Sequence, residues 1–386
     1  MAVAQPHPCP CPCPVLSSLS HVVTRLDTNE EENSCLCFSR NGSLLTGHKS
    51  KFKVWTSASC RHEWTLTHVV DIPERGCVTC ITQYPNAGEK YAVSFSNCVA
   101  IYDLFSRPQL LHMFHFNSDE VNQIDINAKA SFICACDDSG DIKVIDMETL
   151  CLYRSLSRQH DNICSTVKFN ARKPWEIFSG GLDCQLIRWD FSRGRPLVSV
   201  NVSERNDEVK DHTACKPAIE SYMVNPPMVH SVDVFSSIHS LVCGLGNGSV
   251  SVYSALSPKK LEVICSAPLH SASVACVCSV ETSEQQESRY VISGGNDGRI
   301  CISRFQYKRQ PTVQTKKRHN KEHQTWGELH LIATIKHGSK LNWIVASSED
   351  SKLLKPTASL VLSHTLVIIA ADQTRQLTVY EVICDS

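Results

Sequence analysis

The stretch at 179–190, SGGLDCQLIRWD, decides the fold of this 386-residue chain. Two short β-rich runs flank a tight turn of small and polar residues, and the second run ends in Trp-Asp. Short apolar-polar runs on both sides of such a turn predict a pair of neighbouring antiparallel strands.

The same phrase returns along the whole chain, and long helical periodicity is absent. Seven runs pair a strand, a tight turn and a second strand: 44–56, 91–103, 135–146, 179–190, 243–254, 293–304 and 369–381. Self-similarity at a period near 40 residues or more is typical of an array of stacked sheets.

These phrases resemble WD40 repeats, whose pattern is a small-small turn, Asp, Gly, an alternating strand and Trp-Asp. The match is near complete at 179–190 and good at 135–146 and 293–304, and the other four runs are degenerate. The resemblance implies an all-β, closed seven-bladed propeller of four-stranded sheets. Such a ring presents loops on a rigid scaffold, so other proteins are the expected partners.

Ring closure is expected from the two ends of the array. The last repeat ends at 377–383 and lacks an outer strand, which would leave an open sheet edge. His21–Asp27 has the β-branched content to fill that place, so we expect the N-terminal strand to complete the last blade. An unclosed ring or a six-bladed one is the alternative.

The predicted domains are a Pro/Cys-rich disordered tail at 1–20 and a propeller at 21–386, with rim insertions at 203–227 and 308–328. Three tail cysteines at alternate positions offer ligands to a soft metal, but no second group matches them at the usual spacing. The basic run at 316–321 is either a nuclear-import signal or a solvated loop.

Composition limits the possible partners. The net charge is −1, and the basic run has few aromatic neighbours, so nucleic acid is not expected. The 21 cysteines lie mostly in apolar runs, and no signal peptide or membrane-spanning stretch is recognisable. We expect free thiols, an intracellular (cytoplasmic or nuclear) location and a monomeric propeller within a complex.

His160, Ser179, Asp183 and Trp189 have the order and spacing of a WD-repeat tetrad. The resemblance implies a hydrogen-bonded chain in which the histidine joins the turn aspartate to the Ser hydroxyl, and the Trp indole donates to that hydroxyl. Histidines also precede most repeats, at His115, His160, His230, His270 and His337.

A Ser-His-Asp hydrolase triad is the rival interpretation of this set. No nucleophile elbow surrounds Ser179, and its side chain is expected to point inward. The set recurs as His270, Ser293 and Asp297, with Ser303 in the Trp position. Recurrence at repeat spacing favours a structural role, and we expect no catalytic residue.

The lone C-x-x-C at Cys77 and Cys80 falls in a predicted strand, where residues three apart face opposite sides. This placement disfavours a redox or metal role. We expect no metal site and no cofactor.

Two surfaces are candidates for partner binding. The resemblance implies docking onto the damaged-DNA-binding adaptor of a cullin-4 RING ubiquitin ligase, through a box here formed by Asp183, Trp189, Asp190 and Arg193, with the Arg one place late. Residues beside the tetrad positions form the candidate partner rim: Asp119, Asp161, Asn162, Ser271 and Asn296.

Three functions follow from these features. The first is a non-catalytic scaffold that serves as a substrate receptor of that ligase. The second is a general WD-repeat scaffold in a multiprotein assembly without a ligase. The third is a propeller enzyme, for which the sequence offers no converging acid, base or metal-ligating groups at the channel mouth.

Overall fold

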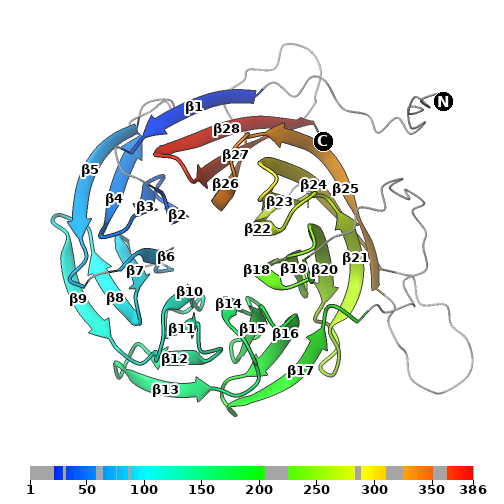
Figure 1. Ribbon diagram of the computed structural model, residues 1–386, viewed down its shortest axis with the longest axis horizontal. Helices are drawn as coiled ribbons and strands as arrows, with labels where there is room; N and C mark the ends of the chain where they lie inside the picture. Colours follow the sequence, from blue (N-terminus) through cyan, green and yellow to red (C-terminus); the bar gives the residue numbers. More distant parts are fainter. Residues whose placement is uncertain are drawn as a thin grey trace, which may run out of the picture.

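Seven four-stranded antiparallel sheets stand around a central channel (Figure 1). The computed structural model describes residues 21–28, 32–57, 64–74, 76–85, 88–204, 225–282, 288–309, 325–350 and 363–385. These ranges contain strands and turns and no helix. The seven-bladed propeller expected from the repeats is thereby confirmed.

The sheets are numbered as blades 1 to 7 along the chain. Blade 1 comprises β2 (Cys35–Phe38), β3 (Leu44–Gly47), β4 (Lys51–Ser57) and β5 (Trp64–Asp71). Blade 2 comprises β6 (Val78–Gln83), β7 (Lys90–Phe95), β8 (Cys98–Asp103) and β9 (Gln109–Phe114). Blade 3 comprises β10 (Val121–Ile126), β11 (Phe132–Asp137), β12 (Ile142–Asp146) and β13 (Cys151–Leu156). Blades 4 and 5 comprise β14 (Cys164–Phe169), β15 (Glu176–Gly181), β16 (Gln185–Asp190) and β17 (Arg195–Asn201); and β18 (Val229–Val234), β19 (Ser240–Leu245), β20 (Ser249–Ser254) and β21 (Glu262–Pro268).

Blades 6 and 7 have the longest strands. They comprise β22 (Val274–Glu281), β23 (Arg289–Gly295), β24 (Arg299–Arg309) and β25 (Thr325–Lys336); and β26 (Leu341–Asp350), β27 (Ser363–Asp372), β28 (Gln376–Asp385) and β1 (His21–Asp27). β24 and β25 therefore extend into both ends of the insertion expected at 308–328. The middle of that insertion, most of the one at 203–227, and the tail at 1–20 lie outside the described residues.

The N-terminal strand closes the ring as expected. β1 pairs with β28 along its whole length, from His21 opposite Val382 to Asp27 opposite Gln376. The inner strand β26 also lies against β2, so blade 7 contacts blade 1 on the channel side (Figure 1). The N-terminal strand β1 thus supplies the outer strand that the last repeat lacks.

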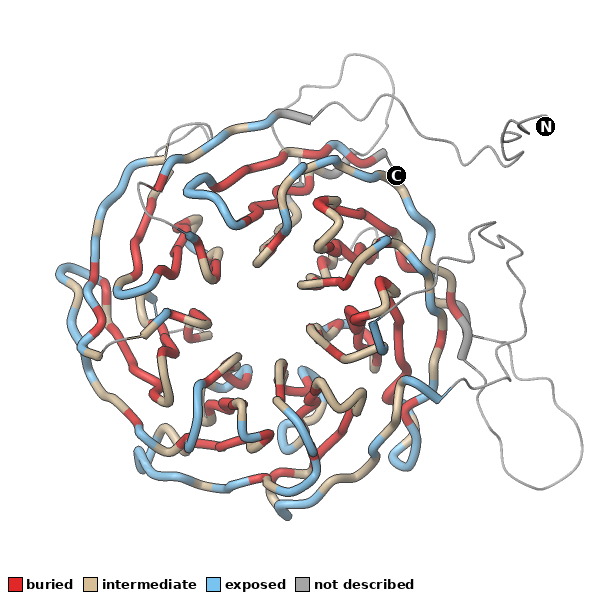
Figure 2. Tube along the Cα trace, viewed as in Figure 1, coloured by how far each residue is buried: buried red, intermediate tan, exposed pale blue. Residues whose placement is uncertain are grey.

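The hydrophobic core lies between neighbouring blades. In one cluster Cys134 and Val144 of blade 3 pack with Val167 and Trp189 of blade 4. The middle strands are the most buried, and the outer strands expose one face to solvent (Figure 2). All 16 cysteines in the described ranges are free thiols, and most are buried, so they serve as small apolar side chains.

The small residues of the repeat allow the blades to approach each other. A Cβ atom on Gly180 would lie 2.3 Å from Cγ1 of Val229, and one on Gly244 would lie 2.7 Å from Cγ1 of Val274. Both valines begin the inner strand of the next blade. Glycine is required at these positions because any larger residue would push the blades apart.

Candidate protein-interaction surfaces

The predicted tetrad is assembled in blade 4. His160 Nδ1 lies 3.0 Å from Asp183 Oδ2, and its Nε2 lies 2.8 Å from Ser179 Oγ. The Trp189 indole N–H donates to the same hydroxyl at 2.8 Å. Ser179 and Trp189 are fully buried, so this chain pairs polar groups that have no access to water.

The carboxyl group of Asp183 is held in its charged form. Burial alone would raise its pKa, but the hydrogen bond from His160 and the backbone N–H groups of Gln185 and Asp161 lower the pKa below its ordinary value. A buried, multiply bonded serine is also a poor nucleophile, because water and substrate cannot reach it. The geometry therefore fits a structural network and not an exposed hydrolytic triad.

Blade 6 repeats the network without its tryptophan. His270 Nδ1 lies 3.0 Å from Asp297 Oδ1, and its Nε2 lies 2.8 Å from Ser293 Oγ. Burial raises the pKa of Asp297, but the Ser271 N–H, His270 and Arg299 outweigh it and bring the pKa to about 2. Ser303 fills the tryptophan position, and its buried hydroxyl finds no partner among the described residues.

Blades 1, 3 and 7 contain variants of this network, and sequence analysis anticipated only the histidine of blade 7, His337. In blade 1, Thr46 Oγ1 lies 2.8 Å from His48 Nε2 and accepts the Trp55 indole N–H at 3.2 Å. In blade 3, Asn117 donates to Asp137 at 3.0 Å. In blade 7, His337 joins Asp372 to the Tyr380 hydroxyl, with Nε2 3.0 Å from the Asp372 carboxylate.

Two of the five expected repeat histidines occupy other places. His115 lies against Cys98 of blade 2, while Asn117 fills the tetrad position of blade 3. His230 is the extra residue of a β-bulge in β18 and lines the central channel. Bulges occur at the start of most inner strands, and a one-residue insertion moves a side chain to the opposite face.

The propeller has two loop-bearing faces. The tetrad face carries the connections between blades and the turns between each blade's second and third strands, because His160 and Asp183 come from these two segments. The turn face carries the turns between first and second and between third and fourth strands; for example, the Phe191 N–H donates to the Trp175 carbonyl there.

The expected partner rim lies on the tetrad face. Four of its members are exposed: Asp119, Asp161, Asn162 and Ser271. Backbone bonds order these loops, such as the Ser271 N–H to Asp297 and the Asp161 N–H to Asp183. Asn296 is half-buried, so it contributes less to this surface than expected.

The expected docking residues separate into a buried pair and a surface pair. Asp183 and Trp189 belong to the tetrad. Asp190 and Arg193 lie on the turn face, where Arg193 Nε is 3.4 Å from Asp190 Oδ2 and the Arg193 side chain is 66% exposed. The length of β16 separates Asp183 from Asp190 by about 20 Å, so one partner surface cannot contact both as neighbours.

Aromatic residues beside this pair were missed by sequence reasoning. Trp175 is 45% exposed and packs against Phe191, at 5.3 Å between ring centroids. Tyr153 lies 6.3 Å from Trp175, and Arg154 lies over the Tyr153 ring and donates to the Ser192 carbonyl. The only sequence signal for this cluster was a tryptophan within a turn. The repeat pattern alone does not predict that Trp175 lies beside Tyr153 of the neighbouring blade. We call Tyr153, Arg154, Trp175, Asp190 and Arg193 the docking surface.

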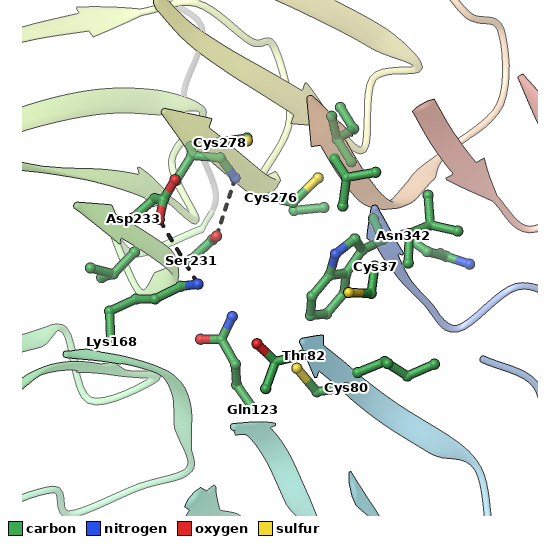
Figure 3. Close-up of a pocket in the computed structure, with 18 of the residues that line it drawn as sticks. Cys37, Cys80, Thr82, Gln123, Lys168, Ser231, Asp233, Cys276, Cys278 and Asn342 are labelled. Atoms are coloured by element: carbon green, nitrogen blue, oxygen red, sulfur yellow. Dashed lines mark hydrogen bonds and ion pairs between the residues drawn. The ribbon is translucent and has the colours of Figure 1, made fainter. Parts of the chain in front are cut away.

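The central channel contains a cavity of about 270 Å³ (Figure 3). Lys168 Nζ lies 3.7 Å from Asp125 and 3.9 Å from Asp233, and Figure 3 shows it reaching toward the latter. Burial opposes the charge on Lys168, but the two carboxylates outweigh it and raise its pKa. This lysine therefore stays protonated and is a poor general base.

The polar groups of the channel also join successive blades. Gln123 Oε1 accepts the Val167 N–H at 2.9 Å, and Asp233 accepts the Ser279 N–H at 2.7 Å. Burial raises the pKa of Cys37, Cys80, Cys276 and Cys278 to about 12 in each case. These thiols stay protonated at neutral pH, which disfavours a nucleophilic role.

Sequence comparison agrees with this architecture. No family model matches the chain. The chain is 25% identical over 273 residues to the WD repeat-containing protein 53 homolog of Dictyostelium discoideum, and the alignment covers 66% of this chain and 70% of that protein. The chain fits the WD40-repeat family. The segments 120–197 and 337–343 by themselves resemble WD repeat-containing protein 53, and the comparison confirms this resemblance.

The seven-bladed propeller and its similarity to a WD-repeat protein support a role as a protein-interaction scaffold. Within the described ranges no helix is long and apolar enough to cross a bilayer. The prediction that the C-x-x-C lies in a strand is wrong for Cys77, which directly precedes β6 and is exposed, whereas Cys80 lies within β6 and is buried. The two thiols nevertheless face different surroundings.

Proposed function

We propose that this propeller is a non-catalytic substrate receptor of a cullin-4 RING ubiquitin ligase. It docks the damaged-DNA-binding adaptor through the docking surface on the turn face. Substrates bind the partner rim on the tetrad face. The observation that carries the proposal is the exposed Arg193 guanidinium beside Asp190, three residues after the Trp-Asp of blade 4.

The chemistry of the docking surface supports a protein contact. Binding energy at interfaces concentrates in a few residues, with Trp, Tyr and Arg enriched among them. The docking surface combines these three residue types in Trp175, Tyr153 and Arg193, drawn from two adjacent blades. An exposed tryptophan ring leaves apolar surface in contact with water, which is unfavourable unless a partner covers it.

The late arginine is compatible with docking because it lies in a turn. Residues Phe191 to Gly194 connect β16 and β17, and Gly194 adopts a φ of +65°. A shift of one residue within a strand would turn the side chain to the other face, but a turn has no such alternation. The Ser192 hydroxyl and the Arg193 N–H both bond to Asp190, which orders this turn.

The tetrad contributes to docking by holding β16 in place. Trp189 precedes Asp190 directly, and its indole is bonded to Ser179. A fixed strand end lowers the entropy that Arg193 would lose on binding. Asp183 and Trp189 would thus act through the position of the turn and not by direct contact.

The deciding experiment compares adaptor binding by the wild type and an Asp190→Ala/Arg193→Ala variant. The matched control is Asp103→Ala/Arg107→Ala, because these residues occupy the corresponding turn of blade 2, where Arg107 is also exposed. We expect the first variant to bind purified adaptor about 30-fold more weakly, which corresponds to about 2 kcal/mol, and the control to bind like the wild type.

Circular dichroism first establishes that all three proteins fold. Retention of adaptor from cell extract provides the second readout. If the wild type does not bind the adaptor, the ligase proposal is wrong and the general scaffold in a multiprotein assembly remains. If both double variants lose binding equally, the effect is not specific to blade 4 and the docking surface is wrong.

A further inference from the structure

The described residues of blade 2 form no tetrad, and three potential metal ligands meet at the corresponding place. Glu74 lies in the connection before β6, Cys98 is the first residue of β8, and His115 directly follows β9. Cys98 Sγ lies 3.0 Å from His115 Nδ1 and 3.2 Å from Glu74 Oε2. In the described ranges this is the one group of three or more His, Cys, Asp or Glu residues with converging ligand atoms.

A shortened turn creates this arrangement. Phe95 pairs with Cys98, so only Ser96 and Asn97 connect β7 to β8, and no turn aspartate is present. The pairing of Tyr91 with Tyr102 corresponds to that of Ile177 with Trp189 in blade 4, which places an apolar Val93 where Ser179 stands. Blade 2 therefore offers neither a tetrad hydroxyl nor a tetrad carboxylate at this place, and in blade 3 Asn117 takes the position expected for His115.

Three polar groups surround the sulfur of Cys98. The single thiol hydrogen can serve only one of the two oxygens that approach it, Glu74 Oε2 and the Asn97 side-chain oxygen at 3.4 Å, and His115 Nδ1 approaches the same sulfur. A tetrahedral zinc site with bonds of about 2.0–2.3 Å has ligand atoms about 3.3–3.8 Å apart. The two distances from the sulfur, 3.0 and 3.2 Å, are slightly shorter than this range, and one ligand atom from each of the three groups lies within 4.8 Å of the others.

We propose that Glu74, Cys98 and His115 bind a zinc-like divalent cation on the tetrad face. One sulfur, one imidazole nitrogen and one carboxylate oxygen form a ligand set that suits zinc. Thiolate and carboxylate together neutralise the charge of the cation. The His115 and Glu74 side chains are 49% and 37% exposed, so the ion can enter from solvent and keep a fourth position for water.

A catalytic Cys-His-Glu triad is the competing interpretation, and the geometry disfavours it. In such a triad the carboxylate orients the imidazole and stays away from the nucleophile. Here Glu74 contacts both the sulfur and, at 3.8 Å, the imidazole. Burial and Glu74 raise the pKa of the Cys98 thiol to about 12, the opposite of what a nucleophile needs. A bound cation would displace that proton.

The test is titration of the full chain with Co²⁺, followed by Zn²⁺ competition. To remove tail thiols from the readout, all proteins carry Cys9→Ser, Cys11→Ser and Cys13→Ser. The variants are Cys98→Ser, His115→Ala and Glu74→Gln. Cys77→Ser is the matched control, because Cys77 is an exposed thiol close in sequence to Glu74.

We expect one Co²⁺ per chain, with a near-ultraviolet sulfur-to-cobalt band and visible absorption typical of tetrahedral Co²⁺. Cys98→Ser should abolish the sulfur band and weaken Zn²⁺ binding by more than about 100-fold, since even outer-shell changes cost about 10–100-fold. His115→Ala and Glu74→Gln should also weaken binding, and Cys77→Ser should leave it unchanged.

Absence of stoichiometric binding to the starting protein would overturn the proposal. Persistence of the sulfur band in Cys98→Ser would overturn it as well, because another thiol would then be the ligand. If Cys98→Ser does not fold, Glu74→Gln decides, since Glu74 lies in a surface connection; unchanged affinity there contradicts the site. Rapid alkylation of Cys98 in the metal-free protein at neutral pH would instead favour the nucleophile.

Discussion

At the scale of single residues, similar buried hydroxyl groups have opposite energetic consequences in different blades. Ser179 has two partners, the His160 imidazole and the Trp189 indole. Ser303 is equally buried, and its hydroxyl has no partner among the described residues. Unmet buried polar groups cost about 1–3 kcal/mol each, whereas removal of an unmet group costs nothing in hydrogen bonding.

We therefore expect Ser179→Ala to lower the free energy of unfolding by about 2 kcal/mol, because it leaves His160 and Trp189 unpaired. Ser303→Ala should leave stability unchanged or raise it slightly. Urea unfolding followed by fluorescence measures both. Equal destabilisation by the two substitutions would contradict the role assigned to the tetrad.

The pKa of Asp297 predicts a pH dependence of stability. Its folded-state pKa, about 2, lies below the ordinary value, so the charged carboxylate stabilises the fold above about pH 4, and this contribution is lost as the pH falls toward 2. Asp297→Asn lacks the charge at every pH. The stability difference between wild type and variant should shrink by about 1–2 kcal/mol between pH 5 and 2.5.

Urea titrations at a series of pH values would measure that difference. A difference that stays constant over this range would mean that the carboxylate is not selectively stabilised in the folded state.

At the scale of elements, β1 is the strand on which closure depends. It covers the edge of β28, and the Thr28 hydroxyl donates to the Arg375 carbonyl. Strand content, turn positions and closure by β1 were predictable from local pattern, because alternation and turn residues act over a few positions. The bulges of the inner strands were not, since they depend on how adjacent blades meet.

We expect deletion of residues 1–27 to lower the melting temperature by at least about 10 °C and to cause concentration-dependent aggregation, because an open edge pairs with other chains. Deletion of residues 1–20 keeps β1 and is the control. Calorimetry and light scattering report the two effects. Equal behaviour of both truncated proteins would mean that β1 is dispensable for closure.

At the scale of the whole molecule, two loop-bearing faces lie at opposite ends of the same strands. The partner rim includes Asp161 and Asn162 on the tetrad face, and the docking surface includes Arg193 on the turn face. Separation by the length of a strand allows both to be occupied at once. A receptor needs this arrangement, because it must hold a substrate and the ligase together.

This separation predicts independent losses of binding. Asp161→Ala/Asn162→Ala should reduce recovery of substrates from cell extract while adaptor binding stays within about twofold of the wild type, because distant sites act additively. Asp190→Ala/Arg193→Ala should do the reverse. Quantitative mass spectrometry of retained proteins separates the two sets. Loss of one common set in both variants would contradict two independent surfaces.

The sequence by itself determined the repeat, the number of blades, the closing strand and the tetrad of blade 4. These features depend on residues close together in the chain or repeated at a constant spacing. Only the tertiary structure decided that Asn117 replaces His115 in blade 3, that His230 lines the channel, and that Trp175 lies beside Tyr153. It also brought Glu74, Cys98 and His115 together. Each of these depends on a bulge, a shortened turn or the contact of adjacent blades, and such packing leaves no periodic signal in the sequence.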